Sequence, residues 1–354
     1  MYAMGNYIFR RLLYMLVVIL VVSLITFLLM HAVPGGPFTQ EKALPEETIR
    51  LLNERYHLND PLYVQYVSYL YAVFVPHFTT IPPSPSYQDD FMLNLKIGDL
   101  WIRWMNFGPS YGARGRTVND IFRDNLPISA QLGVMALLVA ISIGMPLGVL
   151  AALKQNTALD YVGMGIAIFG VSVPVIVLGP ILIWIFGIEL KWLPPTGWTA
   201  KPPFVLGFLP AHPNWEFFQH ALMPSIALGL GSSAVIARLT RASLLQTIRE
   251  DYIRTARSKG LHERTVITRH ALKNSLIPVV TVLGPLFAAL VTGTFVTELI
   301  FGIPGMGKYF VTSITNRDYP VIMGTILLYA VFLVISNLVV DILYAYLDPR
   351  IRYD

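Results

Sequence analysis

Long uncharged apolar runs alternate with short polar segments along most of the chain. A helix needs roughly 17–25 apolar residues to cross a bilayer, and six runs have about this length. They are Leu12–Val33, Ile128–Leu153, Tyr161–Ile188, Ala221–Ala237, Asn274–Thr297 and Tyr319–Val340. The pattern therefore predicts an all-α integral membrane protein with six transmembrane helices, and an even number places both termini on the same side.

The first run, Leu12–Val33, directly follows Arg10 and Arg11. A signal peptide has an apolar core of roughly 7–15 residues followed by a small-residue cleavage site. This run is longer, and it ends at Pro34-Gly35-Gly36-Pro37, which is a poor cleavage site. We therefore interpret it as a retained transmembrane helix.

Basic residues in the short loops predict the orientation, because Lys and Arg accumulate on the cytoplasmic side. With the N-terminus inside, the inner segments carry 14 basic residues and the short outer loops carry 4, namely Lys191, Lys201, Lys308 and Arg317. The long loop is left out, since loops beyond about 60 residues do not follow the rule. We expect a cytoplasmic N-terminus at 1–11, a first transmembrane helix at 12–33, an extracytoplasmic loop at 34–126, and a five-helix core at 127–354 that contains a cytoplasmic loop at 238–273.

The composition excludes most other classes of protein. Hydrophobic residues make up 55% of the 354 residues and charged residues only 13%, about half the usual share in soluble domains. Cysteine is absent, which excludes disulfides, thiolate metal sites and a Cys nucleophile. The net charge of +5 is mild and fits membrane topology and membrane lipid rather than nucleic acid.

The cytoplasmic loop 238–273 is the most informative segment, with nine basic and three acidic residues. Within it an apolar residue recurs every fourth position, at Leu244, Ile248, Tyr252 and Ala256, which predicts one helix with an apolar stripe. Lys259 and then Gly260 have the arrangement of a helix C-terminus, and a second helix is expected at about 264–276. Glu250 and Arg254, four residues apart, are expected to pair.

Three interpretations of this helix–Gly–helix unit are open on spacing alone. The basic residues could simply hold the loop inside, or they could bind anionic lipid. Nucleic-acid binding would require the same positive charge. However, a loop that is tethered at both ends to membrane spans is poorly suited to enter a groove of DNA or RNA. A docking element for a cytoplasmic partner explains both the charge and the apolar stripe.

The loop also resembles a known family. Residues 251–261, with the sequence DYIRTARSKGL, are followed by RHALKN at 269–274 and by Pro278. This segment resembles the EAA loop of ABC importer permeases, most closely the dipeptide/oligopeptide/nickel group, although Arg-Thr-Ala stands at 254–256 where the general motif opens Glu-Ala-Ala. Other motifs similar to that family are Arg10-Arg11, Gly115-Arg116-Thr117-Val118, Leu239-Thr240-Arg241-Ala242-Ser243, Pro304-Gly305-Met306-Gly307, Arg317-Asp318-Tyr319-Pro320 and Leu347-Asp348-Pro349-Arg350.

The resemblance implies a type I ABC importer permease fold in the inner membrane. It implies a translocation pathway for peptides, a homologous second permease subunit, two cytoplasmic ATP-binding subunits that hold ATP and Mg, and an extracytoplasmic substrate-binding protein. This chain itself would hold no cofactor and catalyse no reaction. The resemblance assigns contact with the ATPase to Tyr252, Arg254, Thr255, Ala256, Arg257, Lys259 and Gly260, and we expect Tyr252 and Ala256 to touch the partner directly. The residues that contact substrate stay unassigned.

Two features of the sequence are misleading. Residues 302–308 fit G-x-x-x-x-G-K, but Tyr309 stands where a phosphate-binding loop needs Ser or Thr, so we expect a tight turn and no nucleotide. The seven histidines form no metal-binding pattern.

Glu298 and Asp341 lie at the ends of the last two runs and are expected to reach the interface or a neighbouring helix. An ion- or proton-coupled carrier would need carboxylates within the spans, and a membrane enzyme would need a catalytic constellation. The substrate could also be a nickel chelate or an oligosaccharide.

Overall fold

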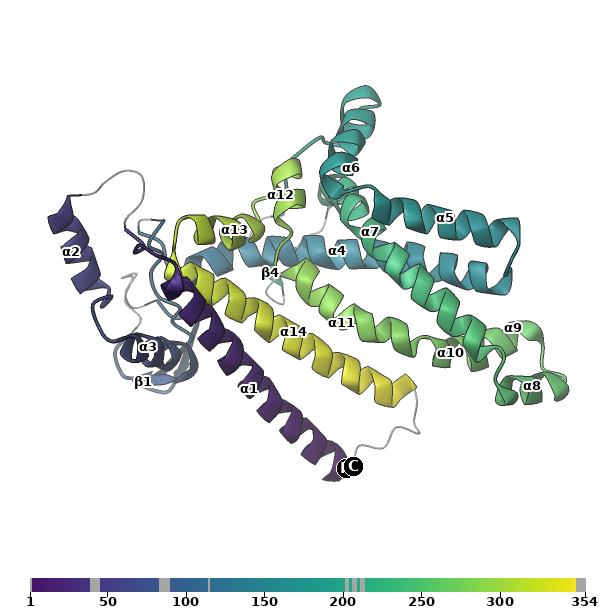
Figure 1. Ribbon diagram of the computed structural model, residues 1–354, viewed down its shortest axis with the longest axis horizontal. Coiled ribbons are helices and arrows are strands. Elements are labelled where there is room, and N and C mark those ends of the chain that lie inside the picture. The colour runs from purple at the N-terminus through teal and green to yellow at the C-terminus, as the bar shows by residue number, and fades with distance from the viewer. Residues whose placement is uncertain are drawn as a thin grey trace. The chain divides into compact units, whose positions relative to one another are not determined.

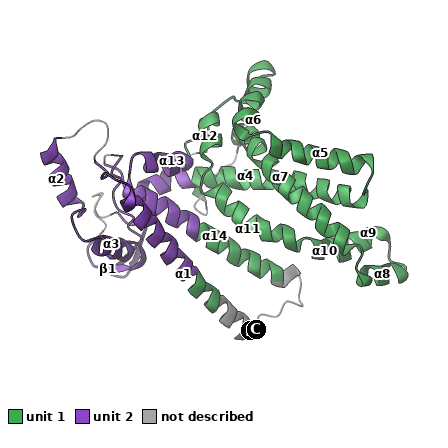
Figure 2. Cartoon of the chain, viewed as in Figure 1, with its two compact units in different colours: residues 1–14, 127–305, 331–354 green, residues 15–126, 306–330 purple. Residues whose placement is uncertain are grey.

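The computed structural model describes residues 2–38, 45–82, 90–113, 115–200, 204–205, 209–210 and 214–347. The chain forms two compact units (Figure 2). Unit 1 contains residues 1–14, 127–305 and 331–354, and unit 2 contains residues 15–126 and 306–330. Lys201, Arg350 and Arg352, which entered the predicted orientation, and residues 348–350 of the last motif lie outside the described residues.

Four helices are long and apolar enough to cross a membrane by themselves (Figure 1). They are α1 (Tyr2–Ala32), α4 (Val118–Leu153), α7 (Trp215–Thr247) and α14 (Tyr319–Leu347). Two bent pairs pass the same test, so the described residues hold up to six spans. This agrees with the predicted membrane protein of six spans, and the helix α1 begins earlier than the predicted boundary at Leu12.

The third predicted span, Tyr161–Ile188, is not one straight helix. It consists of α5 (Ala158–Ser172), α6 (Val175–Leu182) and the π-helix η2 (Ile183–Glu189), with a bend of 101° after α5. Pro174 explains the break, because proline has no N–H to donate and disfavours helical geometry in the preceding residue. Val173 is accordingly extended, with φ −95° and ψ 109°.

The fifth predicted span is also divided. The segments α9 (Glu263–Thr265), η3 (Val266–Ala271) and α10 (Leu272–Ser275) lead into α11 (Ile277–Val291) across a bend of 50°. Gly293, at φ +122°, follows α11 and precedes the short helix α12 (Phe295–Phe301). The predicted span Asn274–Thr297 therefore contains α11, a break at Gly293 and the start of α12 rather than one continuous helix.

Glycines allow the long helices of unit 1 to pack closely. Gly144 and Gly148 lie one turn apart on α4, where a Cβ would come within 2.4 Å of the Ser233 carbonyl oxygen and 2.6 Å of the Ala237 carbonyl oxygen on α7. This is the small-residue packing typical of membrane helices. The helix α7 also lies beside α5 and α11, so it is the central element of unit 1 (Figure 1). The two short strands of this unit, β4 (Phe204–Val205) and β5 (Leu209–Pro210), pair antiparallel.

Unit 2 contains most of the predicted outer loop and is not purely helical. Its helices α2 (Glu46–Arg55), α3 (Leu62–Phe74) and α13 (Gly307–Thr315) accompany a small antiparallel sheet, in the order β1 (His77–Thr79), β3 (Leu100–Trp104), β2 (Leu93–Ile97). The all-α prediction missed this sheet. Its apolar core includes Phe107, Val118, Ile121, Phe122, Met306, Val321 and Leu327.

Candidate coupling loop

The loop after α7 contains a break that the apolar stripe did not predict. The helix α7 ends at Thr247, and a separate helix α8 runs from Asp251 to Ser258. Glu250 is extended, with φ −67° and ψ 148°, and precedes α8. Its position before the first turn, followed by Asp251, suits the positive end of the new helix. The prediction of one continuous helix is therefore wrong, and Arg254 pairs with Asp251 at 3.3 Å rather than with Glu250.

The stripe residues nevertheless meet, because α8 folds back against the chain. Leu244, Ile253, Val266 and Ala271 are fully buried in one cluster, and Ile248 and Tyr252 pack at its edge. Ala256 is only 6% exposed and belongs to the same cluster. Its contribution to the loop is therefore internal packing, whereas the stripe predicted a surface contact with a partner.

Tyr252 fixes α8 to the segment that leads into α11. Its ring is half-buried, and its hydroxyl oxygen accepts a hydrogen bond from Asn274 Nδ2 at 2.9 Å. The same hydroxyl donates to the His270 carbonyl oxygen at 3.4 Å. A displacement of α8 would therefore be transmitted to η3 and α10 through both apolar packing and polar contacts.

The outer face of α8 carries the remaining candidate residues. Arg254, Thr255, Arg257, Lys259 and Gly260 are all exposed. Gly260 follows the helix with φ +75°, which confirms its predicted place just beyond the C-terminus. Three of these five residues are basic, and two of them are paired, Arg254 with Asp251 and Arg257 with Glu263.

A salt bridge closes the turn between the two helices of the loop. Arg257 donates to both carboxylate oxygens of Glu263, with Nη2–Oε1 at 2.7 Å and Nε–Oε2 at 3.1 Å. Hydrogen bonding to this carboxylate raises the pKa of Arg257 above its ordinary value. The bridge spans Gly260 and connects the two sides of the glycine turn.

Sequence reasoning missed a buried ion pair that connects this region to the spans. Arg241 on α7 donates from Nε and Nη2 to the two carboxylate oxygens of Asp160, each at 2.7 Å. The Asp160 side chain is 3% exposed, and it also accepts from the Asn156 backbone N–H at 3.0 Å. Two sequence signals were present: the isolated acidic residue at the start of a long apolar run, and the motif Leu239-Thr240-Arg241-Ala242-Ser243 that contains its partner. The pair ties the start of α5 to α7, a few residues before α7 ends at Thr247.

The carboxylates at the ends of the last two predicted spans reach neighbouring helices, as expected. Asp341 on α14 pairs with Arg11 on α1 at 2.7 Å. Glu298 on α12 is buried and accepts from the Ser129 hydroxyl at 2.7 Å and from the Thr294 N–H at 3.1 Å. Both therefore act in helix packing.

The glycine-rich segment that begins at Gly302 has no architecture for binding phosphate. A phosphate-binding loop follows a strand, whereas the helix α12 precedes this one and Gly302 ends it in the left-handed conformation, at φ +64°. In the described part of the chain, no three His, Asp or Glu side chains gather in a way that could hold a metal ion.

Comparison with known proteins identifies the family. Residues 144–353 match the binding-protein-dependent transport system inner membrane component, and residues 4–95 match the N-terminal part of such membrane components. The chain belongs to this family. It is a multi-pass subunit of the inner membrane, part of a binding-protein-dependent transport complex, and a transporter component rather than an enzyme.

Individual relatives align over the whole chain. The dipeptide transport system permease protein DppB of Bacillus subtilis (strain 168) is 41% identical, with 99% of this chain and 98% of that protein covered. The oligopeptide transport system permease protein OppB of Salmonella typhimurium is 39% identical, with 99% and 100% covered. A chain of the MetNI methionine ABC transporter in inward facing conformations is 17% identical, with a TM-score of 0.47 over 63% of this chain and 94% of that chain.

Proposed function

We propose that this chain lines part of the translocation pathway of an ABC importer for dipeptides or oligopeptides. The observation that carries the proposal is the identity of about 40% over the whole length to permeases named for these two substrates. The expected partners are a homologous second permease, two cytoplasmic ATP-binding subunits and an extracytoplasmic substrate-binding protein. ATP and Mg bind to the ATP-binding subunits, so this chain needs no cofactor of its own.

In this proposal the loop 238–273 couples the ATPase to the spans. Arg254, Thr255, Arg257, Lys259 and Gly260 offer an exposed surface to the ATP-binding subunit. Ala256 and Tyr252 support that surface from within, through the buried cluster and the hydroxyl contacts. The Asp160–Arg241 pair then connects the end of α7 to α5. A displacement of α8 would thus be transmitted to three helices that belong to candidate membrane spans: α5, α7 and α11.

The coupling is a shift between two populations of the transporter. ATP can favour one state only if the ATP-binding subunits interact with this chain more strongly in that state. A coupling loop that is well packed and rigid serves this purpose, since a flexible loop would absorb the movement. Membrane lipid surrounds the spans and has no assigned site.

Uptake in cells that lack their own peptide importers tests this proposal. Cells carrying the whole transport system should accumulate a radiolabelled dipeptide such as Ala-Phe only when the ATP-binding subunits are intact. If a nickel chelate or an oligosaccharide inhibited this accumulation and other peptides did not, the substrate class would be the inhibitor's and not peptides. Full uptake in the absence of the ATP-binding subunits would instead indicate an ion- or proton-coupled carrier.

A further inference from the structure

Unit 2 contains a cavity of about 540 Å³ that lies entirely among its own residues. Pockets for small ligands commonly measure about 300–1,000 Å³, so the volume suits a small molecule. Exposed residues such as His57 and Ser68 line part of it, so it opens to the surface. The coupling mechanism makes no use of this cavity.

Aromatic rings form much of the lining. Tyr111 lies with its ring centroid 4.7 Å from that of Tyr56 and 6.5 Å from that of Tyr319. The ring of Tyr319 in turn lies 4.8 Å from that of His31. Such rings offer flat apolar surface for a side chain, and their faces also attract a cation.

Two buried polar atoms in the lining have no hydrogen-bond partner among the described residues: His31 Nε2 and the Tyr69 hydroxyl. His31 Nδ1 lies 2.8 Å from the Phe27 carbonyl oxygen, which can only accept, so Nδ1 carries a proton. In the tautomer that is protonated at Nδ1 alone, Nε2 is an acceptor. Burial raises the pKa of Tyr69, so its hydroxyl stays able to donate. Buried polar atoms normally find partners, and a ligand with both an N–H and a carbonyl would supply them.

The lining also carries the charged residues Arg55 and Asp60, and the Asp60 carboxylate lies 3.5 Å from His57 Nδ1. An acyl chain of a lipid would offer nothing to these charges or to the two orphaned polar atoms. A short peptide has a terminal ammonium, a terminal carboxylate, amide groups and an apolar side chain, and each has a counterpart in the lining. We propose that this cavity is a binding site for a short peptide with free termini.

The motif Arg317-Asp318-Tyr319-Pro320, which resembles the permease family, contributes two residues to the wall of the cavity, Tyr319 and Pro320. Asp318 accepts from the Ser110 hydroxyl at 2.5 Å, from the Tyr111 N–H at 3.0 Å and from the Gly112 N–H at 2.9 Å. It thereby fixes Tyr111, while the adjacent Tyr319 lines the cavity directly. The motif at 317–320, which has no part in the coupling function, therefore positions residues of the cavity wall.

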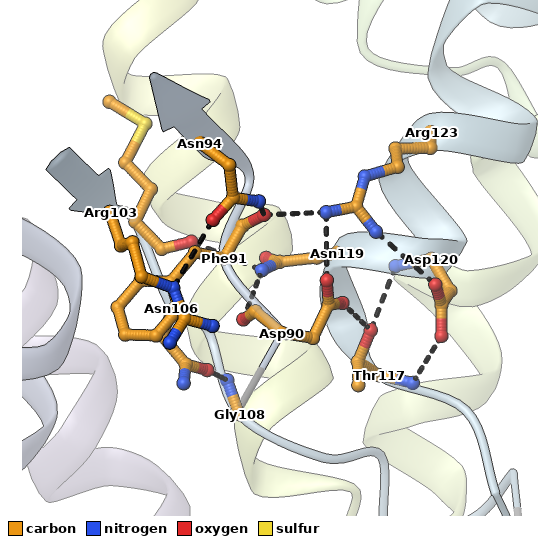
Figure 3. Close-up of polar contacts among 11 residues, drawn as sticks. Asp90, Phe91, Asn94, Arg103, Asn106, Gly108, Thr117, Asn119, Asp120 and Arg123 are labelled. Atoms are coloured by element: carbon orange, nitrogen blue, oxygen red, sulfur yellow. Dashed lines mark hydrogen bonds and ion pairs between the residues drawn. The ribbon is translucent and has the colours of Figure 1, made fainter. Parts of the chain in front are cut away.

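A second network fixes the wall at residues 105–108 (Figure 3). Asn119 Nδ2 donates to the carbonyl oxygens of Asp90 and Met105, at 2.9 Å and 3.1 Å. Asn106 Oδ1 accepts from the Gly108 N–H at 2.9 Å, and Asn106 and Gly108 both line the cavity. The wall is held in place before any ligand arrives, so binding requires little reordering.

This peptide site rests on the proposed transport of peptides. The experiment below distinguishes failure of the site from failure of the proposed transport. The full chain in nanodiscs of phosphatidylethanolamine and phosphatidylglycerol is irradiated with a dipeptide of Ala and p-benzoylphenylalanine, and labelled residues are mapped by mass spectrometry. Label should fall on the lining segments 27–31, 55–72, 106–111 and 319–323. Ala-Phe should compete, and its N-acetylated, C-amidated form should not.

Tyr69→Phe, which removes only the orphaned hydroxyl, should weaken competition by Ala-Phe about twofold to tenfold, as expected for one hydrogen bond. Tyr63→Phe on the same helix is the matched control, since Tyr63 is 72% exposed and does not line the cavity. The Tyr63→Phe variant should bind Ala-Phe with the same affinity as the wild-type chain. Both variants keep the aromatic ring, and their insertion is checked by membrane yield.

Ala-Phe uptake by cells is measured in parallel. Normal uptake with no label in the lining, or with Tyr69→Phe unchanged in affinity, would overturn the peptide site and leave the proposed function standing. Label that is displaced by added phosphatidylethanolamine but not by Ala-Phe would assign the cavity to a lipid headgroup. Absence of Ala-Phe uptake together with absence of label would overturn both the transport of peptides and the site.

Discussion

Gly260 has a backbone conformation that other residues adopt only at a cost. Its φ is +75°, and a Cβ at this position would have no atom within 4 Å, so a side chain there meets backbone strain and no steric clash. The strain is about 1 kcal/mol or more, and a β-branched residue is especially disfavoured at positive φ. Gly260→Val should therefore redirect the segment after α8 and reduce peptide uptake per ATP hydrolysed by about fivefold. Uptake and ATPase activity of the reconstituted complex are measured side by side.

Gly260→Asn is the matched control, because asparagine tolerates the left-handed conformation better than other residues with a side chain. It should keep most of the coupling that Gly260→Val loses. Equal loss in both variants would mean that the glycine is needed for access by the partner rather than for its φ angle. Wild-type coupling in Gly260→Val would remove this turn from the coupling pathway.

At the scale of the elements, the contact between α4 and α7 depends on Gly144. A Cβ at this position would lie 2.4 Å from the Ser233 carbonyl oxygen, which is backbone and cannot rotate away. Gly144→Ala should therefore separate the two helices and destabilise unit 1 by about 1–3 kcal/mol. Thermal unfolding of the purified subunit in detergent, followed by tryptophan fluorescence, measures the change.

Gly165→Ala on α5 provides the comparison, since a Cβ there has no atom within 4 Å. Alanine is a better helix former than glycine, so this variant should unfold at the same temperature as the unchanged chain or slightly higher. A similar loss of stability in both variants would show that the close approach of α4 and α7 is not the cause.

The Asp160–Arg241 pair is expected to hold α5 against α7. Asp160 is almost fully buried, and removing one partner of a buried pair costs about 3–5 kcal/mol because the other charge stays uncompensated. Since the Arg241 side chain is 27% exposed, Asp160→Asn should cost less than this range but clearly lower the unfolding temperature. The double variant Asp160→Asn/Arg241→Gln should regain part of the lost stability, because it no longer leaves an unpaired charge. Arg254→Gln, which breaks a pair whose side chains are 72% and 94% exposed, should leave stability unchanged.

These elements also show what the sequence could and could not predict. Membrane spans were predictable because apolar length is a local property, and Gly260 was predictable because a helix end has a local signature. The bend at Pro174 was present in the sequence, but the apolar run across it hid its size. Asp160 and Arg241 lie 81 residues apart, so their pairing depends on the packing of α5 against α7, which no local pattern reveals. The sheet of unit 2 was missed because its strands are only three to five residues long.

For the whole molecule, the distribution of basic residues predicts that 34–126 is extracytoplasmic and that 238–273 is cytoplasmic. The cavity of unit 2 can receive a peptide from outside only with this orientation, and the exposed face of α8 can meet a cytoplasmic ATPase only with the same one. Two separate proposals therefore depend on a single property, and a test of orientation bears on both.

The absence of cysteine makes this test direct, because each introduced thiol is the only one in the chain. Asp99→Cys lies in the exposed turn between β2 and β3, and Ser258→Cys lies on the exposed end of α8. A membrane-impermeant maleimide should label Asp99→Cys in cells whose outer permeability barrier, where present, has been opened. It should label Ser258→Cys only after the inner membrane is permeabilised, and unchanged peptide uptake shows that both variants are folded. Labelling in the reverse order would place α8 outside, where no ATPase can reach it, and would overturn the coupling role together with the entry of peptide through unit 2.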